Sequence, residues 1–213
     1  MNYILWLSRA WKTLCSAYLP LGPRPIIQVN HSAKILIVGQ APGSQVHETG
    51  IPFDDPSGNR LREWMGIDKS VFYDELKLAI VPMGFCFPGT GKSGDLPPRL
   101  ECAETWRKKL LNELPQISLT LVIGQYAQAW HLGQLVKENL TETVKAWKEF
   151  GPEIIPLPHP SPRNNIWLKK NPWFEQEVLP KLQAKVQSIL KWKPIYSGFG
   201  TTTLTSSGIP TRQ

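Results

Sequence analysis

The sequence predicts a parallel α/β sandwich that occupies most of this 213-residue chain. Short, mostly apolar runs of four or five residues recur along it, and segments with helical spacing of apolar residues separate them. Strands that alternate with helices in this way are typical of a parallel sheet covered by helices. The runs that we assign to strands are residues 34–38, 78–81, 119–123 and 154–157.

The two ends of the chain are expected to lie outside this domain. The apolar run within residues 1–25 is too short for a signal peptide or a membrane span. We therefore expect these residues to form an amphipathic N-terminal helix and a linker. Residues 197–213 are rich in Gly, Thr and Ser and are predicted to be a disordered tail. We therefore place the domain at residues 26–196.

Loops and helices are expected between the strands. The loop after the first strand should end at Ser57, which is placed to cap a short helix that Gly66 closes. Residues 83–101 are rich in Gly, Pro and Lys and predict a second long loop, and loops of this length are usually functional or disordered. Further helices are expected over residues 104–114, 126–132 and about 172–190.

Two segments directly follow predicted strands, where α/β proteins carry their ligand-binding loops. Together they could form a pocket for a flat, polar ring. The first segment is Gly39, Gln40, Ala41, Pro42 and Gly43. The second is His159, Pro160, Ser161, Pro162, Arg163 and Asn164.

The first segment and Phe53 each admit two interpretations. Gly39 and Gly43 would let backbone N–H groups approach a ligand closely, although such turns also serve structure alone. Phe53 stands between Pro52 and two aspartates, so its ring is either a stacking face for a base or an anchor for the loop.

His159 lies between two prolines, which give the imidazole a rigid mount. A single His is commonly a structural hydrogen-bonding group, but the residues that follow favour a functional role. Ser161, Arg163 and Asn164 can all donate hydrogen bonds to phosphate. This set of phosphate donors could be extended by Lys92, Lys169 and Lys170, unless these are ordinary surface charges.

Composition agrees with a polyanionic partner. Lys and Arg number 24 against 17 Asp and Glu, a formal net charge of +7, which suits nucleic acid but could also serve solubility. Three cysteines, Cys15, Cys86 and Cys102, form no even-numbered disulfide set and favour a reducing, cytoplasmic location. We expect a monomer with no membrane partner.

Taken together, these motifs resemble the uracil-DNA glycosylase superfamily. The chain is most similar to the iron–sulfur branch, whose first motif reads Gly-Glu-Ala-Pro-Gly and whose second begins His-Pro-Ser. The pattern Gly-x-Pro-Phe followed by Ser-Gly-x-x-Leu, here from Gly50 to Leu61, is also found in that branch. The resemblance covers roughly residues 34–190 and implies a three-layer α/β/α sandwich with a central four-stranded parallel sheet.

The resemblance also implies a DNA-repair hydrolase that flips a deaminated or damaged base out of DNA and cuts the base–sugar bond. Residues 39–43 would bind the edge of the base and Phe53 would stack on it. His159 would stabilise negative charge on the leaving base. The residues that we expect to contact DNA are Ser57, Lys92, Ser161, Pro162, Arg163, Asn164 and Asn165.

Gln40 departs from the branch, which has a catalytic Glu at this position. An amide can position a water molecule but cannot accept its proton. The acids nearby are Glu48, Asp54 and Asp55, and we favour Asp55 because it lies just beyond Phe53.

The chain also differs from the branch in the residues expected to read the base and in its number of cysteines. Many relatives have a uracil-reading Asn about four residues before Cys86, where this chain has Val-Pro-Met at residues 81–83; Gln125 could supply an amide instead, or simply begin a helix. Cys15, Cys86 and Cys102 match three of the four iron–sulfur ligands of the branch. Since four thiolates normally hold a cluster, we expect neither a cluster nor another metal.

The sequence therefore predicts a glycosylase that hydrolyses the N-glycosidic bond of uracil or another deaminated or damaged base in DNA, with activity or specificity altered by Gln40. One alternative is a catalytically inactive nucleic-acid-binding module that keeps the pocket. Another is a hydrolase of free bases or nucleosides, whose substrate binding would depend only weakly on salt.

Overall fold

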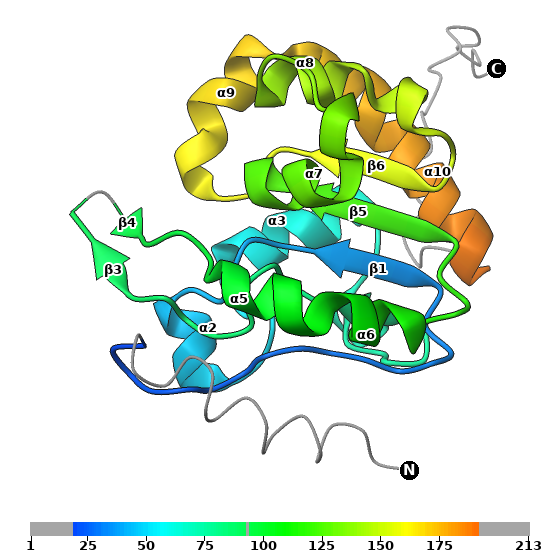
Figure 1. Ribbon diagram of the computed structural model, residues 1–213. Coiled ribbons are helices and arrows are strands. Elements are labelled where there is room, and N and C mark those ends of the chain that lie inside the picture. Colours follow the sequence, from blue (N-terminus) through cyan, green and yellow to red (C-terminus); the bar gives the residue numbers. More distant parts are fainter. Residues whose placement is uncertain (1–18, 93, 192–213) are drawn as a thin grey trace, which may run out of the picture.

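The computed structural model describes residues 19–92 and 94–191 (Figure 1). Its centre is a four-stranded sheet in the order β2-β1-β5-β6, and every neighbouring pair is parallel. The strands are β1 (Ile35–Val38), β2 (Leu78–Ile80), β5 (Leu119–Ile123) and β6 (Ile154–Leu157). The predicted parallel α/β fold is confirmed, and each strand lies within one residue of its expected bounds.

Helices of varied length connect the strands. The α-helices are α2 (Ser44–Thr49), α3 (Pro56–Met65), α4 (Lys69–Phe72), α5 (Leu100–Cys102), α6 (Lys108–Asn112), α7 (Gly124–Leu132), α8 (Leu140–Lys145), α9 (Asn165–Lys170) and α10 (Leu179–Leu190). Two π-helical segments, η2 (Ala103–Arg107) and η6 (Phe174–Val178), run directly into α6 and α10. Single 3-10 turns are η3 (Gly133–Leu135), η4 (Trp147–Phe150) and η5 (Pro162–Asn164).

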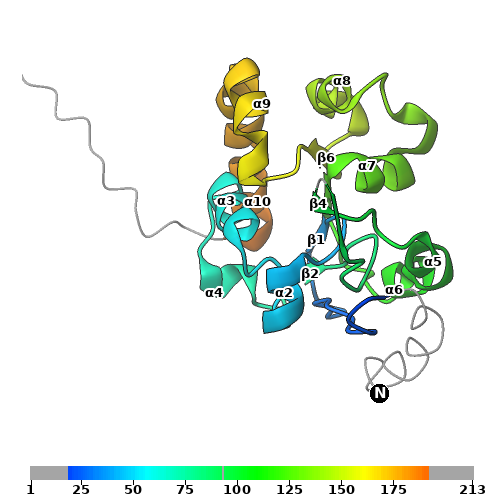
Figure 2. The ribbon, with the colours of Figure 1, turned by 90° about the vertical axis from the view of Figure 1, so that its left-hand side faces the viewer.

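The helices form a layer on each face of the sheet, because successive strand residues point to opposite faces. In β1, Ile35 and Ile37 belong to an apolar cluster with side chains of α3 and α10. Leu36 and Val38 belong to a second cluster with side chains of α6 and α7. Figure 2 shows the strands between these two layers, so the predicted three-layer sandwich is confirmed.

One of the segments predicted to be a loop contains a small hairpin. Within residues 83–101, β3 (Thr90–Gly91) and β4 (Gly94–Asp95) pair antiparallel and extend beyond the carboxyl end of the sheet (Figure 1). The loop expected before Ser57 likewise contains α2. Strands of two residues and a helix of six are too short to produce a recognisable period in the sequence.

The prediction that Ser57 caps α3 is wrong. Asp55 is the capping residue, and its Oδ1 accepts a hydrogen bond from Gly58 N at 2.8 Å. Pro56 takes the first position of the helix, which suits proline because the N–H at this position has no partner within the helix. The cap therefore lies two residues before Ser57, which is buried in the first turn.

The strand order places a ligand site at the carboxyl edge of the sheet. β1 has β2 on one side and β5 on the other, so the order of connection reverses between β1 and β5, where open α/β sheets bind ligands. Residues 39–43 leave β1 at this edge, and residues 158–164 leave β6.

The predicted N-terminal helix, the predicted C-terminal tail and Cys15 lie outside the described residues. Within residues 19–92 and 94–191, no helix combines the length and the apolar character that crossing a membrane requires.

Candidate functional site

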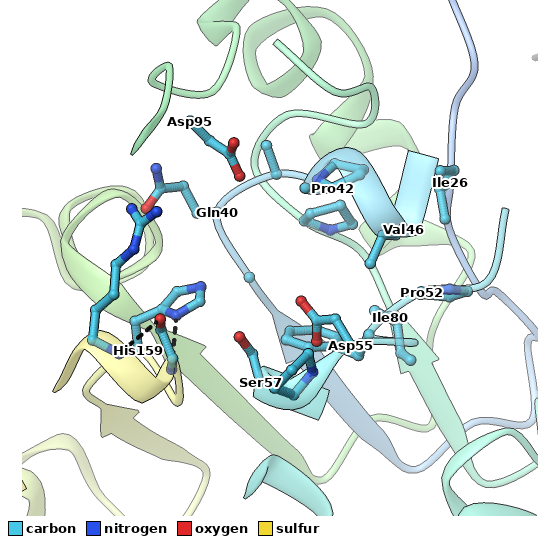
Figure 3. Close-up of a pocket in the computed structure, with 18 of the residues that line it drawn as sticks. Ile26, Gln40, Pro42, Val46, Pro52, Asp55, Ser57, Ile80, Asp95 and His159 are labelled. Atoms are coloured by element: carbon cyan, nitrogen blue, oxygen red, sulfur yellow. Dashed lines mark hydrogen bonds between the residues drawn. The ribbon is translucent and has the colours of Figure 1, made fainter. Parts of the chain in front are cut away.

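A cavity of about 440 Å³ lies at the carboxyl ends of β1, β2 and β6 (Figure 3). Both motif segments contribute to it, although more than 100 residues separate them in the sequence. The predicted site residues that line the cavity are Gly39, Gln40, Ala41, Pro42, Gly43, Phe53, Asp55, Ser57, His159, Ser161, Pro162, Arg163 and Asn164. The structure thus brings together nearly all of the residues that the motifs suggested.

The cavity has an apolar side and a polar side (Figure 3). The apolar side is formed by Ile26, Val46, Pro52 and Ile80. The polar side includes Gln40, Asp95 and His159. A ring with one apolar and one polar edge matches this division better than a uniformly charged ligand does.

Residues 39–43 are held by backbone hydrogen bonds to the segment after β2. Met83 N donates to Gly39 O and Gly84 N donates to Gln40 O, both at 2.9 Å. A Cβ atom on Gly39 would lie 3.1 Å from Cζ of Phe53, so glycine lets the Phe53 ring lie directly against the turn. The turn therefore presents a fixed backbone edge beside an aromatic ring.

Phe53 anchors its loop and also lines the cavity, while stacking on a base stays a prediction. Its ring packs edge-on against Phe72, with centroids 6.1 Å apart, and it also lines the cavity. Its φ angle of 55° is unusual for a residue other than glycine, and such strain is common at binding sites. A Cβ on Gly58 would lie only 1.8 Å from Phe53 O, so the start of α3 fits tightly under this residue.

His159 is held in one orientation by its own loop. Its Nδ1 accepts a hydrogen bond from Ser161 N at 3.2 Å, and Asn164 Nδ2 donates to His159 O at 2.7 Å (Figure 3). An Nδ1 that accepts carries no proton, so in the neutral imidazole the proton is on Nε2.

Burial lowers the pKa of His159, and the negative charges of Asp55 and Asp95 counter this only in part. The imidazole is therefore neutral at neutral pH. It has one N–H available for a ligand, and this donor needs no proton from solvent to form a hydrogen bond.

Arg60 of α3 fixes the loop that follows His159. Its Nη1 donates to Ser161 O at 3.0 Å and its Nη2 donates to Asn165 Oδ1 at 2.8 Å. Ser161 Oγ in turn accepts from Arg163 N at 3.2 Å. Sequence reasoning missed Arg60, because its partners lie about 100 residues further along the chain and no local pattern marks it.

Asp95 is the second residue that sequence reasoning missed. It lies on β4, is exposed and lines the cavity, and it is close enough to His159 to affect the pKa of the imidazole. The turn sequence Gly-Lys-Ser-Gly before it is a hairpin signal that could have indicated the two short strands.

Several other candidates lie apart from the cavity lining. Lys92 is exposed in the hairpin turn, and Asn165 is exposed at the start of α9. Of the remaining acids that could replace the missing Glu, Glu48 and Asp54 do not line the cavity, and Asp54 pairs with Lys69 at 3.4 Å. Gln125 is exposed on α7 and does not line it either.

Pro82 lies in the segment where relatives have a base-reading Asn, and it lines the cavity with an apolar ring. Behind it, Arg107 is completely buried and its Nη1 donates to the carbonyls of Val81 and Pro82, both at 3.0 Å. Burial lowers the pKa of Arg107 to about 9. The guanidinium therefore remains charged at neutral pH and fixes the backbone beside the cavity.

Cys86 and Cys102 are both buried in one apolar cluster, each 5% exposed. They are two thiols, whereas an iron–sulfur cluster normally takes four, so the donors in the described part of the chain do not fit that group by themselves. Residues 19–92 and 94–191 also contain no group of three or more His, Cys, Asp or Glu side chains suited to a metal ion.

Comparison with known families agrees with this geometry. The model of the uracil DNA glycosylase superfamily matches residues 26–183, which is well over half of the chain. The chain belongs to this superfamily.

Proposed function

We propose that this member of the uracil DNA glycosylase superfamily hydrolyses the bond between a deaminated or damaged base and its sugar in DNA. The observation that carries the proposal is the pairing of a neutral, oriented His159 with Phe53 and the 39–43 turn around one cavity. An extruded base can stack on an aromatic ring while its edge meets backbone groups and a fixed donor.

In the proposed reaction, His159 acts on the leaving base. As the glycosidic bond breaks, its electron pair passes to the base, and negative charge grows on a carbonyl oxygen of the ring. The Nε2–H of His159 donates a hydrogen bond to this oxygen. Because the imidazole is half-buried and already oriented, the donor needs no reorganisation as the charge develops.

DNA would bind across the mouth of the cavity. Ser161, Arg163 and Asn164 supply donors for phosphate from the loop that Arg60 fixes. Lys169 and Lys170 are exposed at the end of α9, the helix that continues from this loop, and could contact neighbouring phosphates. Binding should therefore weaken steeply as salt rises.

The identity of the target base and the assignment to the iron–sulfur branch are also proposals. Uracil is the first candidate, yet Pro82 offers no side-chain donor or acceptor to read a uracil edge. The apolar side of the cavity suits a base with an apolar substituent, such as thymine, or a larger ring such as hypoxanthine. Placement in the iron–sulfur branch rests on the motifs alone.

Release of base under single-turnover conditions tests the proposal. Labelled oligomers would carry uracil, thymine, hypoxanthine or xanthine, in single strands and in mispairs, and alkaline cleavage would reveal the abasic product. We expect release of at least one base by the wild-type protein and none by His159→Ala. Release that is equally fast in His159→Ala would contradict the proposed role of this residue.

A non-catalytic role is the second candidate, and Gln40 is the observation that favours it, because the acid found there in the branch is missing. A binding module of this kind would hold uracil-containing oligomers tightly and release no base. A titration of the same oligomers by fluorescence anisotropy separates the two functions.

A further inference from the structure

We infer that Asp95, on the β3–β4 hairpin, positions the attacking water and accepts its proton. This inference rests on the proposed glycosylase function and assigns the acid that the reaction otherwise lacks. Gln40 can hold a water molecule through its amide, but an amide is not a base at neutral pH. A carboxylate that faces the same cavity can supply the missing step.

The position of Asp95 agrees with this role. It borders the same cavity as Gln40 and His159 (Figure 3). A Cβ atom on Gly43 would lie 3.2 Å from Asp95 Oδ2, so the carboxylate lies close above the turn that carries Gln40. The amide and the carboxylate thus approach the cavity from one side, where they could share a water molecule.

Backbone contacts fix the hairpin strand that carries Asp95. Leu96 N donates to Gly89 O at 2.8 Å, directly after Asp95. Gly94 has a φ angle of 130°, which favours glycine, and a Cβ atom there would lie 2.3 Å from Nη1 of Arg163. The hairpin therefore lies against the Arg163 side chain of the loop after His159, and its backbone at position 94 favours glycine.

Asp55 is the competing acid, and the structure gives it another task. Its Oδ1 accepts the hydrogen bond from Gly58 N that caps α3. By contrast, no hydrogen bond or ion pair within residues 19–92 and 94–191 engages the carboxylate of Asp95. Asp95 is also the more exposed of the two, which gives a water molecule direct access.

The proposed step balances as a hydrolysis. The water oxygen forms a bond to the anomeric carbon of the sugar, and the glycosidic bond breaks with its electron pair on the base. One water proton passes to the Asp95 carboxylate and then to solvent. The base leaves as an anion that His159 stabilises and is protonated from solvent.

Three substitutions test the assignment in single-turnover base release with the full chain. We expect Asp95→Asn to lower the rate by about 100-fold, the usual contribution of a general base, without weakening DNA binding. Asp55→Asn, which keeps a capping side chain, should lower the rate by less than about tenfold. Asp54→Asn serves as the matched control outside the cavity and should retain the wild-type rate.

Chemical rescue distinguishes a base from a structural residue. Sodium formate should restore part of the activity of Asp95→Ala, whereas sodium chloride at equal ionic strength should not. An unchanged thermal unfolding midpoint of both Asp95 variants would show that they are folded. Asp95→Asn with a rate near that of the wild type, or a larger loss in Asp55→Asn, would overturn the inference while the glycosylase function stands. A wild-type protein that releases no base would overturn both.

Discussion

The two sides of the cavity are held in place by different means. The inner wall, formed by residues 39–43 and Phe53, is fixed by backbone hydrogen bonds and by glycines that leave no spare room. The outer rim, formed by the β3–β4 hairpin and residues 159–165, is exposed or half-buried in its described residues except at Pro160, and it is fixed largely by side chains, of which Arg60 is the clearest case.

This difference predicts that substitutions on the two sides affect different properties of the protein. Added volume that meets the backbone of the inner wall has no room to be absorbed, so it should act on the stability of the whole domain. A change at the rim alters hydrogen bonds and charge around the bound DNA, so it should act on DNA binding and base release. Substitutions on the two sides test this separation, beginning with the largest effect.

Gly58→Ala should damage the inner wall most. The new Cβ atom would meet Phe53 O at 1.8 Å, and because this oxygen belongs to the backbone, the loop must move. We expect the free energy of unfolding to fall by about 3 kcal/mol, at the upper end of the usual range for overpacking. Urea denaturation measures the change.

Gly43→Ala is the matched control. Gly43 also belongs to the inner wall, but its Cβ atom would face the rim and meet only the Asp95 side chain, at 3.2 Å. This variant should lose less than about 1 kcal/mol of stability, because an exposed side chain can rotate away. Equal losses in Gly43→Ala and Gly58→Ala would contradict the distinction between wall and rim.

The histidine that accepts a hydrogen bond from Arg107 should make stability depend on pH. Burial and the charge of Arg107 lower the pKa of His131 to about 3, and His131 Nε2 accepts from Arg107 Nη2 at 3.0 Å. Between pH 3 and 6.5 the unfolded chain binds a proton that the folded chain excludes, so acid favours unfolding.

From pH 6.5 to 4.5, His131 should account for a loss of about 2 kcal/mol, and the lowered pKa of His159 should add a loss of the same sign. Urea denaturation at several pH values measures the slope. His131→Gln keeps an acceptor for Arg107 and should give a shallower slope. A slope unchanged by this substitution would mean that His131 has the same pKa in the folded and the unfolded chain.

Arg60→Ala should separate function from stability at the rim. It removes two hydrogen bonds that fix residues 161–165, while its surroundings are partly exposed. We expect base release to slow by about tenfold, and the free energy of unfolding to change by less than about 1 kcal/mol. Arg60→Lys keeps the charge but cannot make the two hydrogen bonds at once, so it should recover little of the rate. Full recovery would mean that charge alone matters there.

Removal of the two exposed lysines of α9 should have the smallest effect. The double variant Lys169→Ala, Lys170→Ala should bind DNA more weakly, and the slope of log affinity against log salt should fall by about 1 for each phosphate that the variant no longer binds. The rate of base release at saturating DNA should not change. A lower rate with an unchanged salt slope would mean that these lysines act on base release at the cavity and not on phosphate binding.

The sequence predicted the inner wall better than the rim, for a physical reason. Apolar runs and the glycine turn are local patterns, so the strands and residues 39–43 could be located from neighbours in the chain. Asp95 and Arg60 act through partners far away in sequence. The turn before Asp95 indicates a hairpin, but no local pattern shows which residues either side chain meets. Pro56 moved the α3 cap to Asp55, a detail of turn geometry that the motif around Ser57 concealed.

The wall and the rim must act as one site if the protein is a glycosylase, so the most direct test substitutes one residue from each. Single-turnover base release should be measured for Phe53→Ala and His159→Ala beside the wild type, on whichever oligomer the wild type cleaves. We predict that each variant loses at least about 100-fold in rate, because stacking and charge stabilisation act on the same base. Full activity in either variant would contradict the site described for this protein.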